Sequence, residues 1–199
     1  MTDQNLSYTE RVVDSGQWGP GTSWELVLSR KIPDARLCAA VACVAIKDID
    51  AQEVVLTRNV HSSNPDRRNQ WEILAGHIDP LDPADPDGPR EALEDALRRE
   101  AREESGFVID RAKLFGYRSI RNTPPTPYPE LSYMPYYWAT TDQRLVAPTD
   151  PGQPDERSFT LDKIRTFVAA GTMQPAELVV IEHGLAAAAH ELRRVPYEN

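Results

Sequence analysis

Residues 89–105 constrain the fold most, because they combine strong helix signals with an unusual distribution of charge. Pro89 suits a first helical position behind Asp87 or Gly88 as the cap, and strong helix formers follow it without a break. Gly106 is placed to end the helix in a left-handed turn. The sequence therefore predicts a helix over residues 89–105.

The anomaly of this helix is that its apolar face ends in carboxylates. At about 100° per residue, Glu100 and Glu104 project along the apolar face and Glu103 lies beside it. Carboxylates on an inward face cost several kcal/mol each unless something pairs with them, and they also repel one another. A bound divalent cation such as Mg²⁺, which takes oxygen ligands and shares its shell with phosphates, resolves the conflict. The alternative is a solvated Glu/Arg face at a fraying helix end. The apolar positions are Ala92, Leu93, Ala96, Leu97 and Ala101.

The run from Arg99 to Phe107 resembles the second half of the Nudix box, G-x5-E-x7-R-E-U-x-E-E-x-G-U, where U is a bulky apolar residue. Gly76 and Glu91 fall on the glycine and the earlier glutamate of that pattern. This chain has fourteen residues between those two positions, which is more than the pattern has. We interpret the excess, residues 80–88, as a loop inserted before the helix.

The resemblance implies an α/β protein, a Nudix-type α/β/α sandwich with a mixed central sheet. It also implies an enzyme that hydrolyses phosphoanhydrides with the help of a divalent metal. The expected substrate is a nucleoside diphosphate linked to another moiety, such as ADP-ribose or a nucleotide sugar. Two alternatives stay open: a house-cleaning pyrophosphohydrolase of (deoxy)nucleoside triphosphates, and a non-catalytic nucleotide-binding module.

The resemblance further implies the metal ligands and a supporting arginine. Two or three Mg²⁺ ions are expected, with Mn²⁺ as an alternative. Arg99 is expected in the catalytic group, oriented by Glu91, although an ion pair with Asp95 four residues earlier would explain it equally well. The expected metal ligands are Glu100, Glu103, Glu104, Glu91 and, through its backbone carbonyl, Gly76.

The general base is not determined by the sequence, because its identity depends on geometry. The candidates are Glu103 on the helix, Asp155 and Glu156 in a later loop, and Glu130. Substrate contacts are predicted from aromatic and basic residues near the strands, each of which could instead be a core or surface residue. These candidates are Trp71, Arg58, Arg118, Arg121, Tyr128 and Glu130.

The rest of the chain predicts several strands and two further helices in one domain over residues 1–199. Residues 1–23 are polar and indicate an arm or a short edge strand. Helices are expected at 161–170, ended by Gly171, and at 175–194. Strands are expected at 24–31, 37–46, 53–58, 71–75, 113–122 and 131–140.

Charge and hydropathy exclude some classes of function. The formal net charge of -9 argues against a surface that binds duplex nucleic acid, but it allows a small nucleotide bound through metal ions. No apolar run approaches the roughly 20 residues of a membrane span, and the N-terminus lacks a signal-peptide core. We therefore expect a cytoplasmic protein. The resemblance adds a homodimer as the expected assembly.

Overall fold

The computed structural model describes residues 10–60, 67–85, 88–150 and 157–193. An eight-stranded sheet runs in the order β1-β2-β8-β9-β3-β4-β10, and β7 also pairs with β3. The pairing of β3 with β9 is parallel and the other pairings are antiparallel, so the sheet is mixed. Its strands are β1 Arg11–Gln17, β2 Thr22–Leu28, β3 Ala40–Asp48, β4 Glu53–Val55, β7 Leu74–His77, β8 Arg111–Asn122, β9 Leu131–Thr140 and β10 Ser158–Thr160.

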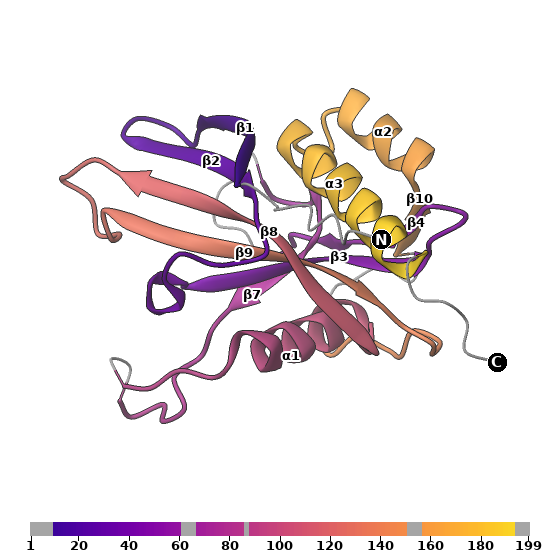
Figure 1. Cartoon of the computed structure of the whole chain (residues 1–199), viewed down its shortest axis with the longest axis horizontal. Coiled ribbons are helices and arrows are strands. Elements are labelled where there is room, and N and C mark those ends of the chain that lie inside the picture. Colours follow the sequence, from indigo (N-terminus) through magenta and orange to yellow (C-terminus); the bar gives the residue numbers. More distant parts are fainter. Residues whose placement is uncertain (1–9, 61–66, 86–87, 151–156, 194–199) are drawn as a thin grey trace, which may run out of the picture.

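Helices cover both faces of this sheet (Figure 1). On one face, Leu97 of α1 and the following Phe107 pack on β3 residues such as Val41. On the other face, Ile181 of α3 packs on Val44, also from β3. Since successive strand residues point to opposite faces, the continuous apolar run of β3 feeds both cores. The predicted α/β/α sandwich is confirmed. The helices are α1 Leu93–Ser105, α2 Leu161–Ala169 and α3 Pro175–Leu192, with a short 3-10 helix, η1, at Ala35–Leu37.

Helix α1 begins at Leu93, so the predicted start at Pro89 was wrong. Residues 89–91 are extended and pair with residues 79–81: Pro80 and Arg90 form an antiparallel bridge, and the Leu81 N–H donates to the Pro89 carbonyl at 2.8 Å. This pairing closes the base of the inserted loop. It holds the backbone outside the helical region, which the local sequence signal could not anticipate.

The other end of α1 lies where the sequence predicts it. Gly106 adopts a left-handed conformation with φ of 69°, and its N–H donates to the carbonyls of Ala101 and Arg102. The carbonyl of Val146 occupies the space where a Cβ of residue 106 would lie. Only glycine satisfies both conditions.

Several strand boundaries differ from the prediction because they depend on distant partners. The apolar run at 37–46 starts as η1, capped by Asp34, and becomes a strand only at Ala40. The segment at 53–58 divides, since Leu56 lies between β4 and the short β5, which pairs with β6 in a separate sheet. The sequence did not predict β10. The two-stranded sheet consists of β5 Thr57–Arg58 and β6 Trp71–Glu72.

The C-terminal helices lie close to their predicted ranges, and Gly171 ends the first of them with a φ of 69°. None of the helices in the described ranges has the length and apolar character that a membrane crossing requires.

Candidate active site

The last turn of α1 packs directly on β7. Glu104 accepts a hydrogen bond from the backbone N–H of Ala75 at 3.2 Å. The side chain of Glu100 lies against Gly76, so that a Cβ on residue 76 would overlap its carboxylate carbon. The strand therefore needs a residue without a side chain at this point, and the glycine lets two carboxylates enter the contact between helix and sheet.

Burial is the main electrostatic feature of these two carboxylates. Burial raises the pKa of Glu104 to about 8, and the nearby charges of Glu100 and Asp150 act in the same direction. Burial also raises the pKa of Glu100, against the opposing effect of Arg99. Two acids in one low-dielectric contact cannot both stay ionised without a compensating positive charge.

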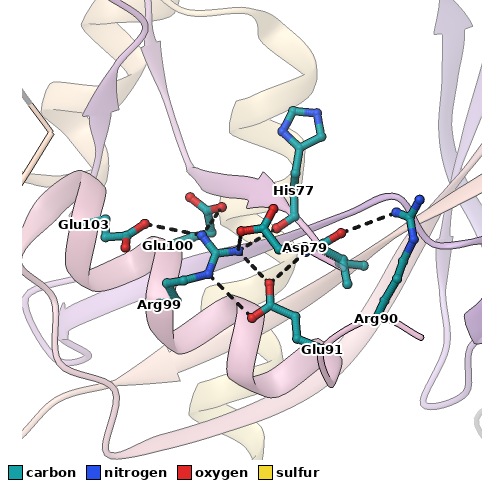
Figure 2. A network of polar contacts seen from close by, with 8 residues as sticks. His77, Asp79, Arg90, Glu91, Arg99, Glu100 and Glu103 are labelled. Atoms are coloured by element: carbon teal, nitrogen blue, oxygen red, sulfur yellow. Dashed lines mark hydrogen bonds and ion pairs between the residues drawn. The ribbon is translucent and has the colours of Figure 1, made fainter. Parts of the chain in front are cut away.

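Arg99 supplies positive charge at the entrance of this contact (Figure 2). Its Nη1 donates to Glu100 at 2.8 Å, and its Nη2 donates to Glu91 at 2.6 Å. The guanidinium lowers the pKa of Glu91, which also accepts a hydrogen bond from the Asp79 N–H at 2.9 Å. Glu91 is thus the principal partner that orients Arg99, while Asp95 is not among the described partners of this arginine. The other acceptors around Arg99 are Glu103 at 3.3 Å, Asp79 at 3.2 Å and the His77 carbonyl at 2.9 Å.

The donor set suits a hard divalent cation. Glu100 and Glu104 offer carboxylate oxygens in a largely buried setting, and Glu103 adds one on the more exposed side, where 41% of its side chain is accessible. In the described part of the chain, no three acidic, histidine or cysteine side chains already converge at ligand spacing, and Glu100 and Glu103 both hydrogen-bond to Arg99. Oxygen donors of this kind are those that Mg²⁺ prefers.

A groove runs along the outer side of α1 next to these carboxylates. It has a volume of about 590 Å³ and contains three arginine side chains from the helix. Positive charge beside a metal-binding face favours phosphate groups. The groove is lined by Arg98, Arg99, Arg102, Glu103, Val108, Ile109 and Thr149.

The predicted substrate-binding residues do not all lie together. Arg118 is 2% exposed and lies on the sheet face that α3 covers. Arg121 is exposed on the opposite face, where it lines a cavity of about 350 Å³ with residues of β1 and β2. Tyr128 is 68% exposed in the loop between β8 and β9, and Glu130 is exposed at the end of that loop.

Trp71 and Arg58 belong to a packed aromatic cluster. Trp71 stacks on Phe167 at 5.5 Å and meets Phe159 edge-on at 4.8 Å. The Arg58 guanidinium lies 5.1 Å from the Trp71 ring and donates to the carbonyl of Asn69. These contacts match the core alternative for Trp71. The candidate bases Asp155 and Glu156 lie outside the described residues.

The structure brings two further acidic residues near the start of β7, and sequence reasoning missed both. Glu72 forms an ion pair with Arg67 at 2.6 Å, and its negative charge raises the pKa values of both Glu104 and Glu177. Glu177, near the start of α3, accepts a hydrogen bond from the Ile73 N–H at 3.4 Å. An acid in the first turn of a helix is common because of the helix dipole alone, so no specific signal in the sequence marks Glu177.

Comparisons with known proteins agree with this architecture. A family model described as the NUDIX domain matches residues 36–182. The NUDIX domain of NrtR from Shewanella oneidensis, solved in complex with ADP ribose, is similar with a TM-score of 0.54 and 18% identity, over 80% of this chain and 93% of that one. A structure titled ADP compounds hydrolase is similar with a TM-score of 0.54 and 16% identity, over 93% and 97%. No curated protein matches the sequence.

Proposed function

Because the chain belongs to the Nudix domain family and is a hydrolase of that family, we propose that it hydrolyses the phosphoanhydride of a nucleoside diphosphate linked to another moiety. ADP-ribose and nucleotide sugars are the substrates of this class that we put first. The observation that carries the proposal is the pair of buried carboxylates, Glu100 and Glu104, between α1 and β7. This pair weakens the fold unless positive charge beyond that of Arg99 joins it, and a diphosphate is the substrate that a metal-loaded carboxylate site serves best.

Each residue of the site has a role in this proposal. Glu100, Glu103 and Glu104 hold Mg²⁺ or Mn²⁺, with the backbone of Gly76 and with Glu91 as further candidates. When bound, two or three such ions neutralise the diphosphate and lower the pKa of an attacking water. Arg99, held by Glu91, keeps the carboxylates of Glu100 and Glu103 in place, and the arginine-lined groove beside α1 receives the phosphate groups.

Two neighbours of known structure support an ADP-linked substrate. One was solved with ADP ribose and the other is titled a hydrolase of ADP compounds. Because both are below 20% identical to this chain, they support the choice of substrates to test first, and the identification itself needs a measurement.

The deciding experiment is hydrolysis of a substrate panel with Mg²⁺ or Mn²⁺. The panel contains ADP-ribose, nucleotide sugars, dinucleoside polyphosphates and nucleoside triphosphates, and phosphate is measured after a coupled phosphatase step. We expect metal-dependent turnover that collapses in Glu103→Gln and Glu104→Gln. Glu94→Gln is the matched control, since Glu94 lies on the exposed face of the same helix and pairs with Arg98. Release of pyrophosphate from nucleoside triphosphates alone would favour the house-cleaning alternative, and binding without turnover would favour a binding module.

The general base is tested in the same assay. The candidates are Glu103, Asp155, Glu156 and Glu130, and each is replaced by its amide. We expect loss of the base to lower kcat by about a hundredfold or more while KM changes little, because general-base catalysis contributes about 10²–10⁴ in rate. A homodimer and a cytoplasmic location complete the proposal, and size-exclusion chromatography with light scattering checks the first of them.

A further inference from the structure

Arg118 is a buried cation with two hydrogen-bond donors that the described part of the protein does not use. Only 2% of the residue is exposed, and neither its Nε nor its Nη2 has a hydrogen-bond partner among the described residues. These two groups lie on the same edge of the guanidinium, the edge that Arg36 uses to hold both carboxylate oxygens of Asp34. Leaving such donors unpaired in the interior costs free energy, so their presence calls for an explanation.

Three aromatic rings surround the Arg118 guanidinium. The rings of Trp24, Trp18 and Tyr136 lie 4.6, 5.0 and 5.4 Å from it. Trp24 Nε1 and Tyr136 Oη are also buried without a hydrogen-bond partner in the described ranges. Trp18 differs from the other two, because it is 47% exposed in the turn between β1 and β2. An arginine edge between rings, with one ring reaching the surface, suits a flat heterocycle that stacks and accepts hydrogen bonds.

An acid within electrostatic reach of Arg118 argues for a neutral ligand group. The positive charge of Arg118 lowers the pKa of Glu177, yet the two side chains do not form an ion pair in the described part of the chain. A phosphate placed at Arg118 would face the like charge of Glu177. A nucleobase that presents acceptors to Arg118 and N–H donors to Glu177 would satisfy both.

The acid near Arg118 and an acid of α1 both bind the segment that leads from β6 into β7. The N–H of Ile73 donates to Glu177, and the N–H of Ala75 donates to Glu104. Ile73 lies between β6 and β7, two residues before Ala75, so at about 3.3 Å per residue of extended chain the two backbone N–H groups are at most about 7 Å apart. That spacing is on the order of a ribose with its phosphate.

We propose that Arg118 binds the base of the substrate and that the base is a 6-oxopurine. Guanine and hypoxanthine present two adjacent acceptors, O6 and N7, which match the two N–H groups on one edge of arginine, whereas adenine presents N7 beside an amino donor. Trp18 stacks on the base, and Glu177 accepts its N1–H. The inference rests on the proposed function and narrows it to the nucleotide-sugar class with guanine or hypoxanthine as the base.

The test measures binding without turnover. Dissociation constants are determined by calorimetry for the α,β-methylene analogues of GDP, IDP and ADP, for a 7-deaza GDP analogue, and for methylenediphosphonate, all with Mg²⁺. We expect the GDP and IDP analogues to bind about tenfold or more tightly than the ADP and 7-deaza analogues, because a two-point arginine contact discriminates by about 1–3 kcal/mol. Equal dissociation constants of the wild type for all the purine analogues would overturn the proposal.

Two variants assign the preference to Arg118. Arg118→Lys keeps the charge and removes the two-point edge, and Arg118→Met removes both while filling the space. We expect each to abolish the preference for the 6-oxopurine and to leave methylenediphosphonate binding within twofold. A parallel loss of methylenediphosphonate binding would assign Arg118 to a phosphate and overturn the inference. Circular dichroism checks that the variants fold.

Hydrolysis of GDP-glucose and ADP-glucose separates the two proposals. A base preference in binding with no hydrolysis of any substrate would overturn the proposed function alone. Hydrolysis with equal kcat/KM for both nucleotide sugars would overturn the base assignment alone.

Discussion

Gly76 has no side chain because the carboxylate of Glu100 occupies the space of a Cβ at that position. We expect Gly76→Ala to displace Glu100, which is a flexible side chain, while leaving the backbone of β7 in place. Activity should fall by about a hundredfold, the order of loss that a displacement of about 1 Å can cause, with little change in melting temperature. Kinetics and thermal unfolding of the same sample check this. A variant with wild-type activity, or one with a much lower melting temperature, would contradict the expectation that the substitution disturbs the site and leaves the fold intact.

Glu177 gives the protein a pH dependence of stability that unfolding measures without substrate. Burial raises its pKa, Arg118 and Arg67 oppose the rise, and Glu72 reinforces it. The folded protein therefore holds this proton more tightly than the unfolded chain does. The stabilisation is fully present below the pKa of the unfolded chain, about 4.3, and is lost as the pH rises through the folded value.

Glu177→Gln keeps the neutral form at every pH. We expect the wild type to lose stability relative to this variant as the pH is raised from about 4 to about 8, which urea unfolding at a series of pH values measures. A constant difference between the two proteins would mean that the burial of Glu177 has no effect on its proton affinity.

The residues that could be predicted from the sequence are those whose position depends on one helix. Glu100 and Glu104 follow from the phase of α1, and the structure has both between α1 and β7. Arg99, which the phase alone puts on the outer face, follows from the resemblance to the Nudix box, and it contacts Glu100. Arg118 could not be assigned in this way. Alternation along β8 determines which residues share its face, but burial of that face depends on α3, a distant element.

The base of the inserted loop behaves as a short hairpin. Pro80 pairs with Arg90, and Leu81 donates to Pro89, so the inserted segment has a closed base. This pairing prevailed over the helix-start signal of Pro89, because a proline at a first-turn position is only a local preference. A preference of this kind could not reveal that residues 79–81 would compete for the same backbone.

We predict that residues 82–88 can be replaced by Asn-Gly, which is a two-residue turn suited to a hairpin. The melting temperature should stay within a few degrees, since shortening a loop changes its closure entropy little. The contacts of Arg99 with Asp79 and Glu91 lie outside the deletion, so kcat should stay within about tenfold of the wild-type value. Thermal unfolding and kinetics check both; a chain that no longer folds would show that the loop is a structural element.

Metal binding should stabilise the protein as a whole, because Arg99 is the one described cation beside the buried carboxylates of Glu100 and Glu104, and of the two it contacts Glu100 alone. At a metal concentration about 100 times the dissociation constant, the gain is about 2.7 kcal/mol. For a chain of this size that corresponds to a rise in melting temperature of roughly 5–10 °C. Differential scanning fluorimetry with Mg²⁺ or EDTA measures it. Glu104→Gln should lose most of the rise and Glu94→Gln should keep it; an equal rise in both variants would locate the metal elsewhere.

The general architecture could be predicted because strand and helix signals alternate along the chain, and a sheet with apolar strands needs helices on both faces. The order of the strands in the sheet could not be predicted from the sequence. Whether β3 pairs with β9, or β10 with β4, depends on contacts between segments far apart in sequence, and no local pattern encodes them.

The parallel pairing of β3 with β9 also has a consequence for how the chain folds. The most apolar strand gains its partner only after a long stretch of intervening sequence has been made, and β2 likewise waits for β8. Closing such distant pairs costs entropy before any contact is gained, so folding is expected to be slow for a protein of this length. During synthesis, β3 stays without its central neighbour until β9 has left the ribosome, which makes the incomplete chain the form most prone to aggregate.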